Sequence, residues 1–218
     1  MSKAGTPPMS RRDFFRRGVV RVAEAALEEA RARAERRTAH WIRPPFAGDE
    51  LDFLFKCTRC GDCIEACPHD VIFPLEARLG PRVVSTPALD LVNKACRLCE
   101  DWPCVAACEP GALEVPKPVD PEAEGENSLR DPAAPRPRLA VARIDRRLCL
   151  PYAGPECGAC AHSCPVPGAL VWDGPKPRIN AASCVGCALC REACIVSPKA
   201  VSISAIAGND IRIGNRSG

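Results

Sequence analysis

Aromatic side chains and long apolar runs are both scarce in this chain of 218 residues. Ten residues are aromatic (Phe 6, Trp 3, Tyr 1), so we expect no conventional aromatic core, and something besides apolar burial must help to stabilise the fold. No run of 18 uncharged apolar residues occurs, which argues against a transmembrane helix. The sequence also lacks a catalytic triad, a phosphate-binding loop and a dinucleotide fingerprint, so we expect no catalytic activity of its own.

Positive charge is scarce outside the N-terminal segment. Residues 1–43 contain 11 Lys and Arg and 5 Asp and Glu, a net charge of +6, whereas the other 175 residues contain 19 and 22, a net charge of −3. Nucleic-acid binding needs a basic face on the folded domain, so the acidic body argues against that function. The basic segment indicates docking or targeting instead.

Cysteine, in contrast, is abundant, and its positions are regular. The 16 cysteines form four groups of four, with none left over. Their spacings are x2-x2-x3, x2-x4-x3, x7-x2-x3 and x2-x2-x3 in chain order. The groups are Cys57, Cys60, Cys63 and Cys67; Cys96, Cys99, Cys104 and Cys108; Cys149, Cys157, Cys160 and Cys164; and Cys184, Cys187, Cys190 and Cys194.

The first group, followed by Pro68, has the C-x2-C-x2-C-x3-C-P pattern of bacterial [4Fe–4S] ligands. Two intervening residues let a tight turn direct successive thiolates to different irons, and the fourth cysteine ligates the neighbouring cluster. We expect that fourth cysteine to begin a helix. The sequence therefore predicts four [4Fe–4S] clusters, with all 16 cysteines as metal-binding ligands.

Two other uses of cysteine are less consistent with this pattern. A disulfide framework suits an even cysteine count in a secreted chain, but it does not explain the fourfold grouping. Zinc sites pair two separated C-x2-C knuckles, whereas these groups place four thiols in one short run.

The cysteine groups divide the chain into an internal repeat. Residues 44–115 and 138–207 hold two groups each, and each is the size of one two-cluster ferredoxin. Residues 116–137 are rich in proline and acidic side chains and read as a linker, and residues 208–218 form a tail. Within residues 1–43, good helix formers predict a helix from about 11 to 38. The predicted fold class is α+β, with tandem bacterial-type two-cluster ferredoxin folds and an N-terminal helical extension.

The second half shows the strands expected of such a fold. Leu139–Ile144 and Ala200–Ser204 are predicted to pair, and Ala169–Trp172 and Arg178–Asn180 flank a turn at Asp173-Gly174. Contiguity assigns the fourth cysteine of each group to the other cluster of its own half. A rival arrangement pairs group one with group four and group two with group three, so that the second pair lies inside the first along the chain. Gly111–Val115 could then form a hairpin with Leu139–Ile144. The sequence leaves both pairings open.

Three stretches resemble one known family over about residues 41–207. They are Ile42-Arg43-Pro44-Pro45 with Phe55-Lys56-Cys57-Thr58-Arg59-Cys60-Gly61, Cys96-Arg97-Leu98-Cys99-Glu100-Asp101-Trp102-Pro103-Cys104, and the x7 gap before Cys157. They resemble the NapF/NapG/MauM ferredoxin-type proteins; the order of spacings is like NapG and MauM, and the missing export core is like NapF. The resemblance implies four [4Fe–4S] clusters and service to a bacterial respiratory oxidoreductase in anaerobic respiration.

Three functions remain open under this resemblance. The leading hypothesis is an electron-transfer protein linking a quinol-oxidising membrane protein and a molybdoenzyme of the periplasmic nitrate reductase type. The alternatives are an accessory protein that helps to mature such a molybdenum-containing reductase, and a ferredoxin-type subunit of a larger enzyme. His69, His162 and Trp102 lie near cysteine groups, and we interpret the histidines as exposed loop residues and the tryptophan as packing.

The N-terminal arginines bear on localisation. The run Ser10-Arg11-Arg12-Asp13-Phe14-Phe15-Arg16 resembles a twin-arginine export motif. An export signal then needs an uncharged apolar region, and here charges interrupt every candidate; they are Arg17, Arg21, Glu24, Glu28 and Glu29. We therefore expect a cytoplasmic protein, with twin-arginine export to the periplasm as the alternative.

Overall fold

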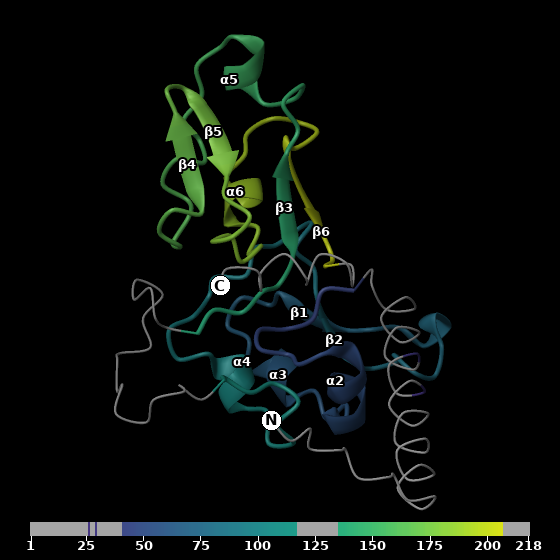
Figure 1. Cartoon of the computed structure of the whole chain (residues 1–218). Coiled ribbons are helices and arrows are strands. Elements are labelled where there is room, and N and C mark those ends of the chain that lie inside the picture. The colour runs from purple at the N-terminus through teal and green to yellow at the C-terminus, as the bar shows by residue number, and fades with distance from the viewer. Residues whose placement is uncertain (1–25, 27–28, 30–40, 117–134, 207–218) are drawn as a thin grey trace, which may run out of the picture.

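The computed structural model describes residues 26, 29, 41–116 and 135–206 (Figure 1). Within these ranges the protein consists of short helices and three two-stranded sheets. The elements up to residue 116 are α2 (Glu50–Lys56), α3 (Asp62–Glu65), β1 (Ile72–Pro74), the 3-10 helix η1 (Ala77–Leu79), β2 (Pro87–Leu89) and α4 (Pro103–Ala106). Those from residue 135 onward are β3 (Val141–Ile144), α5 (Leu150–Ala153), β4 (Leu170–Asp173), β5 (Lys176–Ile179), α6 (Leu189–Glu192) and β6 (Val201–Ser204).

The first half, residues 41–116, closes on itself. Strands β1 and β2 lie between the first two cysteine groups and pair antiparallel, with Ile72 opposite Leu89. Helices α3 and α4, which carry cysteines of the two groups, pack against each other. An antiparallel bridge between Ala47 and Leu113 joins the beginning of this half to its end. The two cysteine groups are thereby brought together around the same helix pair.

The second half, residues 135–206, repeats this plan with longer strands and lies above the first in the view of Figure 1. Strands β3 and β6 pair antiparallel, with Val141 opposite Ser204, which confirms the predicted closing strand. Strands β4 and β5 form the predicted hairpin, with Asp173 opposite Lys176. The two-residue turn between them places Gly174 at φ 57°, a left-handed conformation that glycine adopts without steric cost.

Helix α2 leads the chain directly into the first cysteine loop. The side chain of Asp49 accepts hydrogen bonds from the backbone N–H groups of Leu51 and Asp52, both at 3.1 Å, and so satisfies donors at the helix start. Acidic residues in the first turn and Lys56 in the last turn complement the helix dipole. The helix ends at Lys56, so Cys57 begins the loop.

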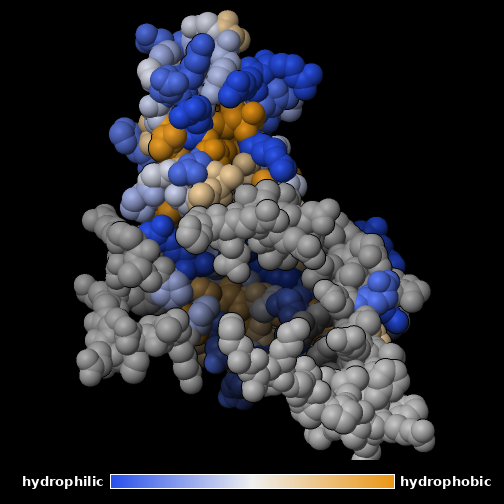
Figure 2. Space-filling view, viewed as in Figure 1, coloured by the Kyte–Doolittle hydropathy of each residue, from blue (hydrophilic) through white to orange (hydrophobic). Residues whose placement is uncertain are grey.

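One hydrophobic core extends through both halves. Phe53 and Trp102 are its large aromatic members, and most of the rest are aliphatic side chains and cysteines from both sides of the linker. A smaller cluster of Leu75, Val83 and Ala88 lies apart from it. Figure 2 shows apolar residues between hydrophilic ones on the second half, over the region of α6. The core is therefore poor in aromatic side chains, as expected from the composition.

Several sequence expectations fall outside the described residues. Of the helix predicted over about 11–38, Ala26 and Glu29 are described, and both are helical. The rest of that segment, most of the linker 116–137 and the tail 208–218 lie outside the described ranges. In the part of the chain that the structure describes, no helix is both long and apolar enough to cross a membrane.

Candidate iron–sulfur cluster sites

The 16 cysteines surround four cavities, four to a cavity, and all are free thiols. The free space in and at the mouth of each cavity, including space open to solvent, is about 330–380 Å³. We name them by their cysteines: site I has Cys57, Cys60, Cys63 and Cys108; site II has Cys67, Cys96, Cys99 and Cys104; site III has Cys164, Cys184, Cys187 and Cys190; and site IV has Cys149, Cys157, Cys160 and Cys194.

This grouping is that of the contiguous arrangement. Each group supplies three cysteines to one site and its fourth cysteine to the other site of the same half. In the nested arrangement, Gly111–Val115 could form a hairpin with Leu139–Ile144. Instead Leu113 pairs with Ala47, and β3 pairs with β6. Strand pairing within each half therefore determines which cysteines share a site.

The loops of three cysteine groups share one backbone conformation. The residue just before the second cysteine has a left-handed conformation: Arg59 at φ 63°, Leu98 at φ 54° and Gly186 at φ 76°. In each loop the backbone N–H of this residue forms a hydrogen bond with the first thiol of the group. Sequence reasoning missed Arg59 and Leu98, because neither side chain favours positive φ. Their position within C-x2-C was the available signal.

A four-residue helix follows in these three groups, and its placement corrects one expectation. Helices α3, α4 and α6 begin after the left-handed residues Gly61, Trp102 and Ala188. Each helix contains the third cysteine of its group and ends two residues before the fourth. The expectation that the fourth cysteine begins a helix was wrong. Because each helix ends before the fourth cysteine, the chain turns between the third and fourth cysteines of the group, and these two cysteines face different sites.

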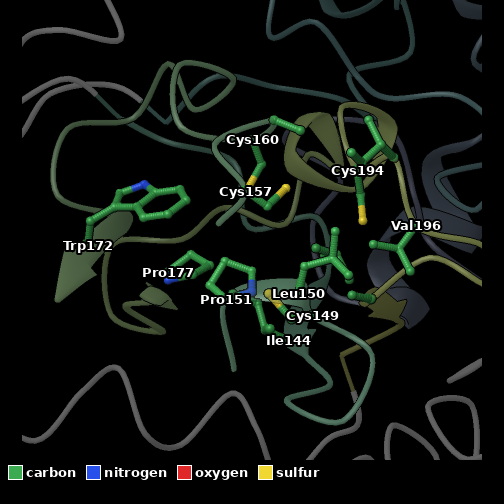
Figure 3. Close-up of a pocket in the computed structure, with 14 residues that line it drawn as sticks. Ile144, Cys149, Leu150, Pro151, Cys157, Cys160, Trp172, Pro177, Cys194 and Val196 are labelled. Carbon is green, nitrogen blue, oxygen red and sulfur yellow. The ribbon is translucent and has the colours of Figure 1, made fainter. Parts of the chain in front are cut away.

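Site IV departs from this scheme. Its x7 gap holds α5, which begins directly after Cys149, and Gly158 has no left-handed conformation. Figure 3 shows the thiols of Cys157, Cys160 and Cys194 around the cavity, with Trp172 and Pro177 along one side. The wall on that side is therefore supplied by the β4–β5 hairpin. The extra residues of the gap build α5, which packs against β5, with the hydroxyl of Tyr152 donating a hydrogen bond to the carbonyl oxygen of Pro177 at 2.9 Å.

Burial raises the pKa of the inner thiols. Desolvation is the largest cause, and negative charge on neighbouring cysteines adds to it. The pKa rises to about 12 for Cys63, Cys104, Cys187 and Cys190 and to about 11 for Cys96. At neutral pH these thiols are protonated, so iron binding must displace their protons.

The same effects show that the sites are adjacent within each half. Besides burial and the thiols of its own site, the pKa of Cys104 in site II responds to Cys63 in site I. The pKa of Cys190 in site III likewise responds to Cys160 in site IV. Coulombic effects of this kind fall off with distance, so sites I and II are neighbours, as are sites III and IV.

The residues present fit iron–sulfur clusters. Each site offers four sulfur ligands in an otherwise largely apolar wall, and backbone N–H groups point at sulfur, such as that of Leu113 at 3.3 Å from Cys108 Sγ. Among the described residues, no three Cys, His, Asp or Glu side chains are arranged to hold a single metal ion. The four sulfurs surround a space instead of meeting at a point, which is a geometry for a polynuclear group and not for one zinc ion.

The side chains singled out near the sites have modest roles. Trp102 is buried, lines site II and contacts Phe46 edge-on, with ring centroids 4.9 Å apart, so it packs as expected. His69 and His162 are exposed, also as expected. Sequence reasoning missed Glu192, which bonds to the backbone of Ala95 in the other half. No local pattern connects residues so far apart in sequence.

Known proteins share these features. Residues 55–73 match the family described as "4Fe-4S binding domain". The chain is 31% identical to the methylamine utilization ferredoxin-type protein MauM of Methylobacillus flagellatus, covering 74% of this chain and 67% of that protein. It is 30% identical to the ferredoxin-type protein NapG of Escherichia coli (93% of this chain, 89% of that protein). It is 32% identical to NapF of the same organism (74% and 85%). The chain therefore belongs to the family of NapG, MauM and NapF ferredoxin-type proteins and is an iron–sulfur electron-transfer protein with [4Fe–4S] clusters.

Proposed function

We propose that the protein holds four [4Fe–4S] clusters, one in each of sites I to IV, in two tandem ferredoxin-type halves. It transfers single electrons between redox partners of a bacterial respiratory oxidoreductase, of the periplasmic nitrate reductase type or a related quinol-linked system. The observation that supports this proposal is the division of all 16 cysteines into four sets around four cavities. The similarity to NapG and MauM supports the respiratory setting.

The protein's own residues would bind the clusters, orient N–H groups toward the thiols and shield the sites from water. Sixteen cysteine sulfurs would hold the clusters, and each bound cluster supplies one-electron redox chemistry. The left-handed residues Arg59, Leu98 and Gly186 direct N–H groups at the thiols, which favours the thiolate form over the thiol. Apolar side chains from both halves exclude water from the cavities.

The two outer sites are suited to exchange electrons with partners. In site I, Cys60 is the one exposed cysteine of the 16. Beside site IV, Ile195 follows Cys194 and has 71% of its side chain exposed. Sites II and III lie between them, because the backbone N–H of Cys96 in site II donates a hydrogen bond to the carbonyl oxygen of Cys187 in site III. We therefore place the donor at one end, a quinol-oxidising membrane protein, and the acceptor, a molybdoenzyme, at the other.

Metal analysis of protein purified without oxygen tests the cluster count. Four clusters require about 16 iron and about 16 acid-labile sulfide per chain, and zinc without sulfide would end the proposal. A relay also predicts that chemically reduced protein passes electrons to an isolated molybdoenzyme of this type. A protein that binds the enzyme precursor equally well with and without clusters would support the maturation role instead.

A further inference from the structure

The two halves meet where the loops of sites II and III touch. The backbone N–H of Cys96, in site II, donates a hydrogen bond to the carbonyl oxygen of Cys187, in site III, at 2.9 Å. These residues belong to different halves and to different sites. This hydrogen bond joins a residue of site II directly to a residue of site III, so the two sites are neighbours. Since I adjoins II and III adjoins IV, the sites follow one another in the order I, II, III, IV.

Two side chains at the end of α6 hold this contact in place. Glu192 Oε2 accepts a hydrogen bond from the backbone N–H of Ala95 at 2.9 Å, and its Oε1 accepts one from Arg97 Nη2 at 2.5 Å. Glu192 thus binds the residues on both sides of Cys96. The neighbouring Arg191 donates from Nε to the carbonyl oxygen of Val92 at 3.0 Å. Residues 92–97 are therefore bound to α6 along their length.

We propose that Glu192 is a positioning residue that holds the loop of site II against the loop of site III, which makes the Cys96–Cys187 contact the junction between the two halves of the relay. This inference rests on the proposed function above. An electron that crosses the junction oxidises the group held at one site and reduces the group held at the other. No covalent bond is made or broken, and the external reductant and oxidant are the redox partners at the two ends.

The first half contains a natural comparison for Glu192. Helix α3 has the sequence Asp62-Cys63-Ile64-Glu65, and α6 has Leu189-Cys190-Arg191-Glu192. Glu65 and Glu192 each follow the third cysteine of their group by two residues and precede the fourth by two. Glu65 is exposed, and its carboxylate has no partner among the described residues. Helix α4 has Ala106 at the equivalent position, so a glutamate there is not needed to build a cysteine site, and the role of Glu192 in α6 is specific to the junction.

The test compares Glu192→Ala with Glu65→Ala in the full chain, purified without oxygen with its clusters. Hydrogen-exchange mass spectrometry should show the amides of Ala95 and Cys96 exchanging at least about tenfold faster in Glu192→Ala, because a charge-assisted hydrogen bond is lost. Electron paramagnetic resonance of dithionite-reduced protein should show weaker magnetic coupling between clusters, at unchanged iron content. The Glu65→Ala protein should match the unmodified protein in both measurements.

Two results would overturn the inference. One is full iron content and unchanged magnetic coupling in Glu192→Ala. The other is seen in the unmodified protein and needs no variant to fold: amides of Ala95 and Cys96 that exchange as fast as those of an exposed loop. Failure of the proposed function itself is recognised separately, as an iron count below that of four clusters in the unmodified protein.

Discussion

Arg43 offers the sharpest test of how the fold supports site I. Its guanidinium is 9% exposed and forms two bonds with Glu50, Nε to Oε2 at 3.0 Å and Nη2 to Oε1 at 2.6 Å. Nη1 donates to Thr86 Oγ1 at 2.9 Å and to the carbonyl oxygen of Pro87 at 2.8 Å. The same group lies over the ring of Phe53, 4.7 Å from its centroid. Arg43 therefore links α2 to β2 through its hydrogen bonds, next to the residues that line site I.

Arg43→Met keeps most of the apolar stem but leaves the Glu50 carboxylate unpaired in a mostly buried position. Glu50 is 11% exposed, and breaking a buried ion pair from one side costs about 3–5 kcal/mol. If ~3 kcal/mol of this cost lowers the free-energy barrier to unfolding, the unfolding rate rises roughly a hundredfold, since each 1.4 kcal/mol or so changes a rate about tenfold. Replacing both partners, as in Arg43→Met with Glu50→Leu, should recover much of the loss because no buried charge remains.

The assay is the rate at which visible cluster absorbance disappears in guanidinium chloride without oxygen. A rate is the proper quantity because cluster loss makes unfolding irreversible. The control is Arg78→Met, which removes an ion pair to Glu76 whose side chains are 78% and 63% exposed; such pairs contribute about 0–1 kcal/mol. If Arg43→Met lost its clusters within about twofold of the control, the reasoning from burial would be refuted.

Three further predictions address a cysteine loop, a potential and localisation. Gly186→Ala should lower the iron content by about one cluster, because a Cβ there would overlap the carbonyl oxygen of Ala140, whereas Gly168→Ala, also at positive φ but with open space around it, should keep its iron; equal iron in both variants would contradict this. Arg59→Gln should lower the reduction potential of site I by roughly 20–40 mV, because a cation near the site favours the added electron; a redox titration followed by electron paramagnetic resonance measures it, and an unchanged or raised potential would contradict it. A reporter fused after residue 43 should stay in the cytoplasm, because charges interrupt the apolar region that export requires; its recovery from the periplasm with the first 30–40 or so residues removed would reverse the expectation.

Local spacing by itself determined much of this protein. The C-x2-C runs identified the thiols, because a ligand loop is built from consecutive residues and its geometry is short-range. The hairpin around Gly174 and the closing strand β6 followed from turn chemistry and alternation for the same reason. The small aromatic content led us to expect no conventional aromatic core, and in the described residues Phe53 and Trp102 are the large aromatic side chains buried in it.

Only the tertiary structure decided how these local pieces combine. Cys67 lies in site II and Cys108 in site I because α3 and α4 pack together, a contact between segments about 40 residues apart that residue spacing does not predict. Arg59 and Leu98 adopt left-handed conformations against their own preference because the surrounding loop holds them there. Glu192 reaches the backbone N–H of a residue 97 positions earlier. Such contacts depend on how the halves dock, and docking is set by the shape of packed surfaces, which residue spacing does not encode.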